Sequence, residues 1–368
     1  MNTTTPRVFI AATRQNEGKT TTSLGLASAL QRHYPKIGYI KPVGQRFVNV
    51  EQQRIDEDII LMDRVYQLNC PLGDMSPIAV DPEFTRRYLA AADPETLQER
   101  VRLAFDRVAW EKDFVLCEGS GHAGVGSVFD LSNARVAKIL GAKVIIVSQG
   151  GIGKPIDEVA VNHALFEKEG VEVVGVILNK VLPDKLDFVI EHTGKGLKRQ
   201  GLELLGVLPR VEILSNPTME LIRDELDVEP LNDSSHLLNL VEEVVVGAMS
   251  VQHALTYFKR GVLVITPSDR EDLILAAATT LFGRGTEGLA GLVLTGGQRP
   301  SESVMRVVAA LPFPVFLSPD ETYRVASKVH DLTIKTRPSD TRKISLIRDL
   351  IAEHVDVDRI IAAVDGCG

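Results

Sequence analysis

The chain has few cysteines, no long apolar run and no excess of basic residues. Its three cysteines, Cys70, Cys117 and Cys367, are far apart and form no CxxC pair, which argues against a disulfide framework or a zinc site. No stretch approaches the roughly 18 apolar residues of a membrane-spanning helix. The N-terminal residues have neither the basic nor the apolar segment of a signal peptide, so we expect a cytoplasmic protein.

The charge balance excludes further classes of partner. The formal net charge is -8, and no segment carries the basic face that binding to nucleic acid or anionic membranes needs. Hydrophobic residues make up 44% of the chain and charged residues 24%, which is typical of a globular protein. We therefore expect small-molecule partners, with no nucleic acid and no membrane.

The length and the order of apolar segments predict a two-domain α/β protein. A chain of 368 residues usually forms more than one core. In the first two hundred residues or so, apolar runs alternate with amphipathic segments, which indicates a doubly wound, mainly parallel sheet with helices on both faces. The strands predicted there are Arg7–Ala12, Ile37–Ile40, Phe114–Cys117, Lys143–Ser148, Val173–Leu178 and Leu204–Leu208.

A domain boundary is predicted near residue 213, where the composition changes and Ser215–Thr218 provides the start of a new helix. We expect residues 1–212 to form a nucleotide-binding domain and residues 213–368 to form a second, smaller α/β domain. Its predicted elements are strands at Val262–Thr266, Leu289–Leu294 and Val315–Leu317 and a terminal amphipathic helix at Asp340–His354.

Residues 13–21 have the composition of a phosphate-binding loop. They are Thr13, Arg14, Gln15, Asn16, Glu17, Gly18, Lys19, Thr20 and Thr21, and they join a predicted strand to a helix-like stretch. Such a loop presents backbone N–H groups and the positive helix end to phosphate, while lysine adds a mobile charge. Thr13 stands where a standard loop has glycine, so the match is a variant. A chance Gly-Lys-Thr turn is the alternative.

We expect ATP or GTP to bind this loop, with ATP preferred, through Thr13 and the residues from Asn16 to Thr21. Lys19 would reach the outer phosphates and act in catalysis if phosphate is transferred, and Thr20 would bind Mg²⁺. Magnesium also needs carboxylates from other strand ends. Glu118 follows a buried strand, with an exposed strand-end glutamate as the alternative. Asp58 is the second candidate, although helix capping explains its position equally well.

Two further polar residues follow predicted strands. Lys41 follows the second strand, where its ammonium group would neutralise charge in a phosphoryl transfer; a solvated lysine is the alternative. Asn179 ends the strand Val173–Leu178, and its amide can pair with the edge of a base; an ordinary loop asparagine is the alternative.

The order of these motifs resembles the dethiobiotin synthetase-like branch of phosphate-loop proteins over about the first 210 residues. The matching motifs are Gly18-Lys19-Thr20, Lys41-Pro42-Val43, Asp58, Glu118-Gly119-Ser120-Gly121, Asn179 and Gly206-Val207-Leu208-Pro209. The resemblance implies Lys19 and Thr20 on phosphate and Mg²⁺, Asp58 and Glu118 as further magnesium ligands, Asn179 and the Pro209 loop around adenine, and Lys41 near the reacting group. Gly44-Gln45 replaces the usual Ala-Ser and His122 replaces a glycine, which argues against a biotin-precursor substrate.

The second half resembles the DRTGG domain through Thr266–Asp272 and Leu294–Gly297. A ligand site is expected at the motif residues Asp269, Arg270, Thr295, Gly296 and Gly297. A capping aspartate with a paired arginine, and ordinary turn glycines, are the alternatives. This pair of domains resembles the N-terminal, non-catalytic half of long bacterial phosphate acetyltransferases. The resemblance implies a stand-alone relative of that regulatory half, without acetyl transfer, that self-associates into a homo-oligomer.

Three functions remain open at this stage. The leading one is a regulatory or scaffold protein that binds Mg-ATP and acts on a phosphate acetyltransferase or a related acyl-phosphate enzyme. The alternative is an ATP-dependent ligase or carboxylase that activates a carboxylate or carbamate as a mixed phosphate anhydride. An enzyme of this kind would be a ligase or a slow ATPase. The third is an assembly module with a relic loop, which Thr13 favours.

Overall fold

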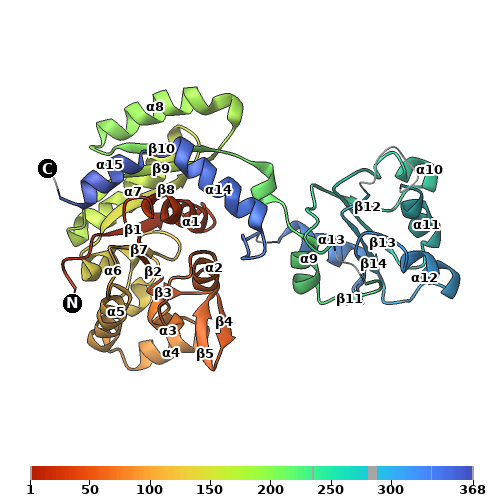
Figure 1. Cartoon of the computed structure of the whole chain (residues 1–368), viewed down its shortest axis with the longest axis horizontal. Helices are drawn as coiled ribbons and strands as arrows, with labels where there is room; N and C mark the ends of the chain where they lie inside the picture. The colour runs from red at the N-terminus through yellow and green to blue at the C-terminus, as the bar shows by residue number, and fades with distance from the viewer. Residues whose placement is uncertain (1, 234–235, 281–287, 333, 367–368) are drawn as a thin grey trace. The chain divides into compact units, whose positions relative to one another are not determined.

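The computed structural model describes residues 2–233, 236–280, 288–332 and 334–366, which form two compact units (Figure 1). Unit 1 comprises Met1–Arg210 and Thr336–Gly368, and unit 2 comprises Val211–Lys335. The predicted division into residues 1–212 and 213–368 differs from this one, because the C-terminal segment returns to unit 1 instead of joining the second domain. Cys367 lies outside the described residues.

Unit 1 is built on a six-stranded sheet in which all strands are parallel, in the order β10-β9-β8-β1-β7-β2. The strands are β1 (Arg7–Ala12), β2 (Ile37–Ile40), β7 (Phe114–Glu118), β8 (Lys143–Gln149), β9 (Val173–Val181) and β10 (Leu204–Pro209). Each begins at the predicted residue, and four of them extend beyond the predicted end. The predicted doubly wound α/β fold is confirmed.

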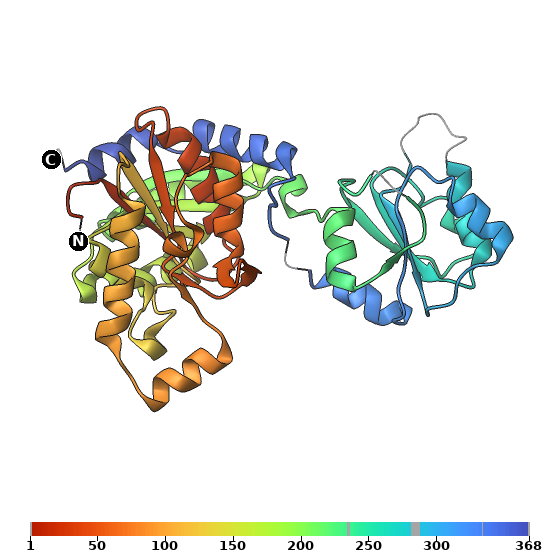
Figure 2. The same cartoon turned by 60° about the horizontal axis from the view of Figure 1, so that its bottom comes forward.

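The topology of the sheet explains why the C-terminal segment packs on unit 1. In a parallel sheet with right-handed crossovers, the direction of a connection along the sheet decides which face its helix covers. The successive connections from β2 through β7, β8 and β9 to β10 all run in one direction, so their helices lie on one face. The connection from β1 to β2 runs in the opposite direction, so its helix lies on the other face. The first group is α5 (Pro94–Val108), α6 (Asn133–Leu140), α7 (Gly153–Glu169) and α8 (Leu186–Arg199). Of the helices in these described crossovers, α1 (Lys19–Leu30) lies on the opposite face. The helices α14 (Thr341–His354) and α15 (Val357–Val364) pack beside α1 and β10 and cover the rest of it (Figure 2).

A second set of short elements lies between β2 and α5 and was not predicted. It comprises β3 (Val43–Gly44), β4 (Phe47–Val50), β5 (Gln53–Asp56), α2 (Glu57–Tyr66), α3 (Leu72–Met75), β6 (Ile78–Ala79) and α4 (Pro82–Ala90). The strands pair as β3 with β6 and as β4 with β5. This excursion matters for the site because β5 ends, and α2 begins, beside the carboxyl end of β2.

Unit 2 contains a five-stranded sheet in the order β11-β15-β14-β13-β12, of which only β11 is antiparallel. Its elements are α9 (Met219–Leu226), β11 (Glu229–Pro230), β12 (Glu243–Val246), α10 (Val251–Ala254), β13 (Val262–Pro267), α11 (Glu271–Thr279), β14 (Gly291–Thr295), α12 (Glu302–Val308), β15 (Val315–Leu317) and α13 (Thr322–His330). The three predicted strands are present, with β14 beginning two residues later. The edge strand β12 was missed.

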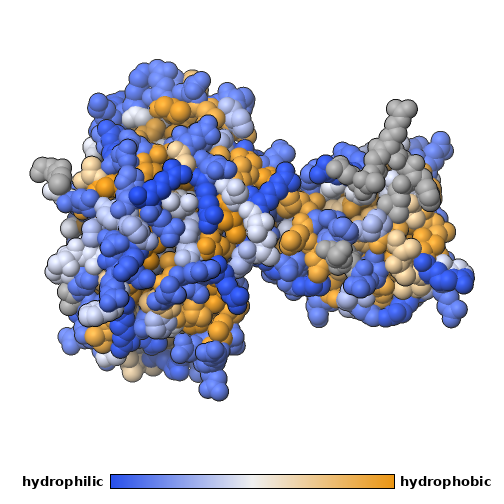
Figure 3. All heavy atoms as spheres, viewed as in Figure 1, coloured by the Kyte–Doolittle hydropathy of each residue, from blue (hydrophilic) through white to orange (hydrophobic). Residues whose placement is uncertain are grey.

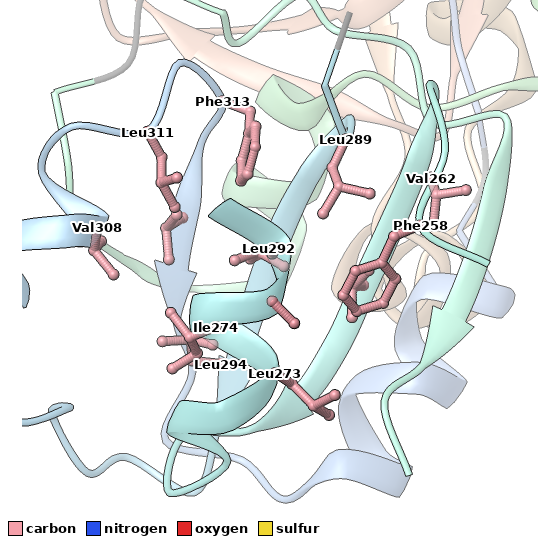
Figure 4. Packing of buried hydrophobic residues seen from close by; sticks show 14 of the residues in the cluster. Phe258, Val262, Leu273, Ile274, Leu289, Leu292, Leu294, Val308, Leu311 and Phe313 are labelled. Atoms are coloured by element: carbon pink, nitrogen blue, oxygen red, sulfur yellow. The ribbon is translucent and has the colours of Figure 1, made fainter. Parts of the chain in front are cut away.

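Unit 2 has a hydrophobic core on each face of its sheet. The strands β12 to β15 follow one another in order, so right-handed crossovers place α10, α11 and α12 on the same face. Phe258, Leu273, Ile274 and Phe313 pack there (Figure 4). The other face is covered by α9 and α13, which bury residues such as Met219. Unit 2 therefore has its own core, as expected of a separate domain.

Hydrophilic residues cover much of the visible surface, with apolar patches between them (Figure 3). The large apolar side chains that are exposed include Leu89, Trp110, Val161 and Phe188. Scattered exposure of this kind is ordinary for a folded protein. Within the described ranges, no helix combines the length and the apolar character needed to cross a membrane.

Candidate functional site

The loop from Thr13 to Gly18 lies at the carboxyl end of β1, between β7 and β8. The chain leaves β1 towards β2 on one side, whereas β8, β9 and β10 extend on the other side. Ligands of open parallel sheets bind where the strand order reverses in this way. Helix α1 begins at Lys19, directly after the loop, so its N-terminal N–H groups and its positive end face the same edge.

Thr13, which replaces the glycine of a standard phosphate loop, is buried and hydrogen-bonded. Its N–H donates to Val147 O at 3.0 Å, and its hydroxyl lies 3.1 Å from the hydroxyl of Ser148 on β8. Asn162 of α7 donates its amide N–H to Thr13 O at 3.4 Å. The threonine therefore attaches the start of the loop to β8, and its polar atoms all have partners. Thr13 therefore has a structural role that does not depend on the loop being a relic.

Two residues of the loop have left-handed backbone conformations. Asn16 has φ 62° and Gly18 has φ 99°. At Gly18 a side chain is also excluded sterically, because a Cβ atom would lie 2.0 Å from Nδ2 of Asn179. Alternation of right- and left-handed residues turns successive backbone N–H groups towards one side and forms a concave site for anions. Asn16 and Gly18 are separated by one residue, so their left-handed conformations are compatible with such an alternation.

Asn179 contacts the loop from the end of β9. Its Nδ2 donates to Glu17 O at 2.8 Å, and its Oδ1 accepts a hydrogen bond from Lys180 N at 2.9 Å. Lys180 in turn donates from Nζ to Asn16 O at 2.6 Å. Pro209 pairs with Val181 in the sheet register, so the end of β10 lies at the same edge. The predicted contact of Asn179 with a base stays a prediction.

Glu118 connects the start of α1 to the carboxyl end of β7. Thr20 donates its hydroxyl to Glu118 Oε1 at 3.0 Å, and Tyr39 of β2 donates its hydroxyl to Oε2 at 2.8 Å. The glutamate is only 1% exposed. Burial raises the pKa of its carboxyl above the ordinary value, and the nearby Asp58 adds to the rise. Both oxygens of this buried carboxylate are thus held by hydroxyl groups.

Lys41 is held between two carboxylates. Its Nζ donates to Asp56 Oδ1 at 2.9 Å and also to Asp58 Oδ2. Burial lowers the pKa of Lys41, but Asp58 and Asp56 outweigh that effect and raise it above the ordinary lysine value. Asp56 also caps α2 by accepting from Asp58 N at 3.0 Å. The ammonium group expected near a reacting phosphoryl group is paired in this structure with the two acids at the start of α2.

The same acids explain one departure from the resembling family. Asp56 Oδ2 is buried and has no hydrogen-bond partner. It lies 2.6 Å from the position that a Cβ atom would occupy at Gly44. An alanine at this position, as in the usual Lys-Pro-Val-Ala-Ser pattern, would collide with the carboxylate. Gly44 therefore makes room for Asp56.

The residues at this edge fit a magnesium ion. Three buried carboxyl groups, those of Asp56, Asp58 and Glu118, share a cluster with the ammonium groups of Lys19 and Lys41, so that acids outnumber bases by three to two. Among the described residues, no group of three or more acidic, histidine or cysteine side chains could hold a metal by itself. Mg²⁺ usually takes only one or two carboxylates and completes its shell with phosphate and water. Hydroxyl and carboxylate oxygens suit it here.

The residues of the predicted second-domain site also meet at one edge of a sheet. Arg270, after β13, donates to Asp272 at 2.9 and 3.0 Å and to Met249 O at 2.9 Å. The guanidinium therefore pairs with Asp272 instead of its neighbour Asp269. The hydrogen bond and charge of Arg270 lower the pKa of Asp272.

The glycines of this edge close a turn. Gly296 and Gly297 have φ of 89° and 71°, and their N–H groups donate to Asp320 O at 2.9 Å and Ser318 O at 3.0 Å. The hydroxyl groups of Thr295 and Thr322 lie 2.7 Å apart. These polar groups are hydrogen-bonded to one another. A turn with such bonds is stable without a ligand.

Sequence reasoning missed several residues of the first site. Tyr39 lies inside an apolar strand and has the pattern of an ordinary core residue, so only its contact with Glu118 identifies it. Ser148 and Asn162 contact Thr13 across more than a hundred residues of chain, a separation that hides their role. Lys180 follows Asn179 directly, and this adjacency was the one available signal.

Comparisons with known proteins identify the family of each part of the chain. Residues 6–218 match an AAA domain and residues 221–332 match a DRTGG domain. The phosphate acetyltransferase of Nitratidesulfovibrio vulgaris is 28% identical over 359 residues, covering 95% of this chain and 50% of the relative. That of Deinococcus radiodurans is 30% identical over 363 residues, again covering 95% and 50%. The chain thus spans about half the length of these relatives.

A likeness to a solved structure was also found. The septum site-determining protein MinD of Pyrococcus horikoshii, complexed with Mg-ADP, is 17% identical, and the match covers 57% of this chain and 84% of that protein with a TM-score of 0.36. The chain belongs to the AAA domain family and, together with the DRTGG domain that follows, matches the N-terminal half of phosphate acetyltransferases.

Proposed function

We propose that unit 1 binds Mg-ATP and that its occupancy serves a regulatory or scaffold role related to phosphate acetyltransferase. The observation that carries the first part is the hydrogen bond from Thr20 to Glu118. It brings the hydroxyl group after Lys19 and a strand-end carboxylate to the edge where the loop and the N-terminus of α1 face a ligand. Phosphate, magnesium and helix end would meet there.

In this proposal each residue has a defined task. Backbone N–H groups from Asn16 to Thr21 and the ammonium of Lys19 would hold the phosphates. Thr20, Glu118 and Asp58 would hold Mg²⁺, which neutralises phosphate charge when it is bound. Pro209 would lie beside adenine, and the amide of Asn179 retains a second N–H for a base edge. Thr13 would support the loop from β8.

The regulatory part rests on the arrangement of domains. The chain matches half of a phosphate acetyltransferase, and the curated relatives contain further sequence that this chain does not match. We propose that the nucleotide state of unit 1 is transmitted to a phosphate acetyltransferase or a related acyl-phosphate enzyme, in a homo-oligomer of this chain. A pull-down with such enzymes, with and without Mg-ATP, tests the partner, and sedimentation tests self-association. Failure to recover any of these enzymes would contradict the proposed partner.

An ATP-dependent ligase is the second candidate, because Lys41 lies in the same buried cluster as Lys19. Two carboxylates hold its ammonium group, however, so it would have to leave them before it could neutralise a phosphoryl group. We therefore expect little ADP release by the protein alone. Rapid ADP formation that depends on an added carboxylate-bearing metabolite would favour the ligase and contradict the regulatory proposal.

Calorimetry with Mg-ATP tests the binding step. Wild type should release or absorb heat with a saturable curve, and Lys19→Ala should bind much more weakly while unfolding at a similar temperature. A wild-type protein that is folded and shows no binding would overturn the proposal. Binding that is equal in the Lys19→Ala variant would show that the nucleotide occupies another place.

A further inference from the structure

The last residues of β9 contact two successive carbonyl groups of the phosphate loop. We propose that Asn179 and Lys180 position this loop for its ligand by holding the carbonyl oxygens of Glu17 and Asn16. The inference rests on the proposed nucleotide binding and names residues that set the shape of the same site. Neither residue needs to touch the phosphates for this role.

The geometry of the peptide unit links these contacts to phosphate binding. In a trans peptide the C=O and the N–H point in opposite directions. Lys180 Nζ holds Asn16 O at 2.6 Å, and Asn179 Nδ2 holds Glu17 O at 2.8 Å. The N–H groups of Glu17 and Gly18 belong to the same two peptide units, so they point away from β9. The two side chains thus fix the direction of two donors of the concave loop.

Asn179 is itself held in one orientation. Its side chain is 7% exposed, and its Oδ1 accepts from the N–H of Lys180 at 2.9 Å. Rotation of the amide by 180° would place two N–H groups, or two oxygens, against each other. Lys180 adopts φ 60°, a left-handed conformation, and its Nζ reaches Asn16 O. The amide therefore presents an N–H, and never an oxygen, to the loop.

The loop contains a left-handed residue that is not glycine, and its neighbours help to hold that conformation. Asn16 has φ 62° without being glycine, and left-handed conformations of this kind persist only when surrounding contacts favour them. Gly18 is close enough to Asn179 that a Cβ atom would overlap Nδ2 at 2.0 Å. Without the two side chains the loop could relax and turn its carbonyl oxygens towards the phosphates.

Three ligands separate this role from recognition of the base. Mg-ATP, Mg-GTP and Mg-tripolyphosphate are titrated into wild type, Asn179→Ala and Lys180→Met. We expect Asn179→Ala to weaken tripolyphosphate binding by about five- to tenfold, as for the loss of one hydrogen bond, and to weaken binding of both nucleotides by at least that factor, because the proposed contact with the base is lost as well. Lys180→Met should weaken all three by the same factor, and Lys180→Arg, which retains a donor, should restore part of the affinity.

Lys154→Met is the matched control for charge. The Lys154 ammonium also acts electrostatically on Glu17, but its ion pair is with Glu158 at 3.8 Å. Its removal should change the three affinities less than Lys180→Met does. An equal effect would mean that charge alone explains Lys180, and would overturn the inference for that residue.

The remaining outcomes are equally decisive. If Asn179→Ala binds tripolyphosphate as wild type does and loses only ATP, the residue reads the base and the inference is wrong. Unchanged affinity for all three ligands also overturns it. If Asn179→Ala does not fold, the exposed Lys180 variants decide. A folded wild type that binds none of the three ligands overturns the proposed function and this inference with it.

Discussion

Replacing Gly25 by alanine tests the contact between the C-terminal segment and the phosphate-loop helix. Gly25 lies in the middle of α1, where α14 packs against it. A Cβ atom there would lie 2.2 Å from Ile351 Cγ1, 2.8 Å from Ile351 Cβ and 2.9 Å from Ile347 O. Rotation of one side chain cannot relieve these overlaps, because a backbone oxygen and a Cβ atom are among them. The two helices must move apart.

The expected cost follows from overpacking of a close contact. An extra methyl group in a packed interior destabilises by about 1–3 kcal/mol, which exceeds the gain of up to about 1 kcal/mol that alanine has over glycine in a helix. For a domain of about 240 residues, such as unit 1, each kcal/mol lowers the melting temperature by about 2–4 °C. Gly25→Ala should therefore melt several degrees lower, and its binding of Mg-ATP should weaken because Lys19 and Thr20 begin the displaced helix.

Gly194→Ala in α8 is the matched control. Its Cβ atom would meet only Leu204 Cδ2 at 3.5 Å, an ordinary contact, so we expect equal or slightly higher stability. In the double variant Gly25→Ala/Ile351→Ala, the second change removes the atom of closest overlap. The total loss should be smaller than the sum of the single losses. If Gly25→Ala is as stable as Gly194→Ala by thermal and urea unfolding, the packing of α14 on α1 is refuted.

Three further substitutions or modifications test other parts of unit 1. Tyr39→Phe leaves an oxygen of Glu118 buried without its partner, which should lower the free energy of unfolding in urea by about 1–3 kcal/mol. It should also raise the magnesium concentration needed for ATP binding. Wild-type behaviour in both assays would contradict the contact. Lys41→Met leaves two buried carboxylates without their cation and should destabilise by about 3–5 kcal/mol; an unchanged melting curve would argue against a structural ion pair. Burial raises the pKa of Cys117 to about 12, so its thiol should react with a disulfide reagent near pH 8 only after unfolding, and rapid labelling of the folded protein, located by mass spectrometry, would contradict this.

The strands of the first sheet could be predicted because their signal is local. A run such as Phe114–Cys117 is apolar on both faces, as a strand buried between two layers of helices must be. The position of the phosphate loop was also accessible, since its residues are contiguous and follow such a run. The edge strand β12 gave a weaker signal, because Val244 and Val246 are exposed and the strand has a partner on one side only.

The contacts between distant residues could not be predicted from patterns. Lys41 pairs with the acids at the start of α2 because of the excursion of short elements between β2 and α5. The sequence of this excursion has little hydrophobic periodicity, so its fold could not be predicted. The return of α14 to unit 1 depends on a face of the sheet that α1 leaves uncovered, which is a property of the topology. The amphipathic pattern of Asp340–His354 predicted the helix correctly but could not identify the surface against which it packs.

The return of the C-terminal helices makes unit 2 an insertion within unit 1. Asp356 N donates to Leu205 O at 2.8 Å, so β10 and the start of α15 are joined although all of unit 2 lies between them in the chain. Closing a flexible loop costs entropy that grows by about 0.6 kcal/mol with each doubling of its length. Once unit 2 has folded, the distance between its two ends is fixed, so most of the loop-closure entropy is already lost. Folding of the inserted domain therefore favours assembly of the helix layer that supports the phosphate loop, and a mutation in the core of unit 2 can weaken unit 1 through chain connectivity alone.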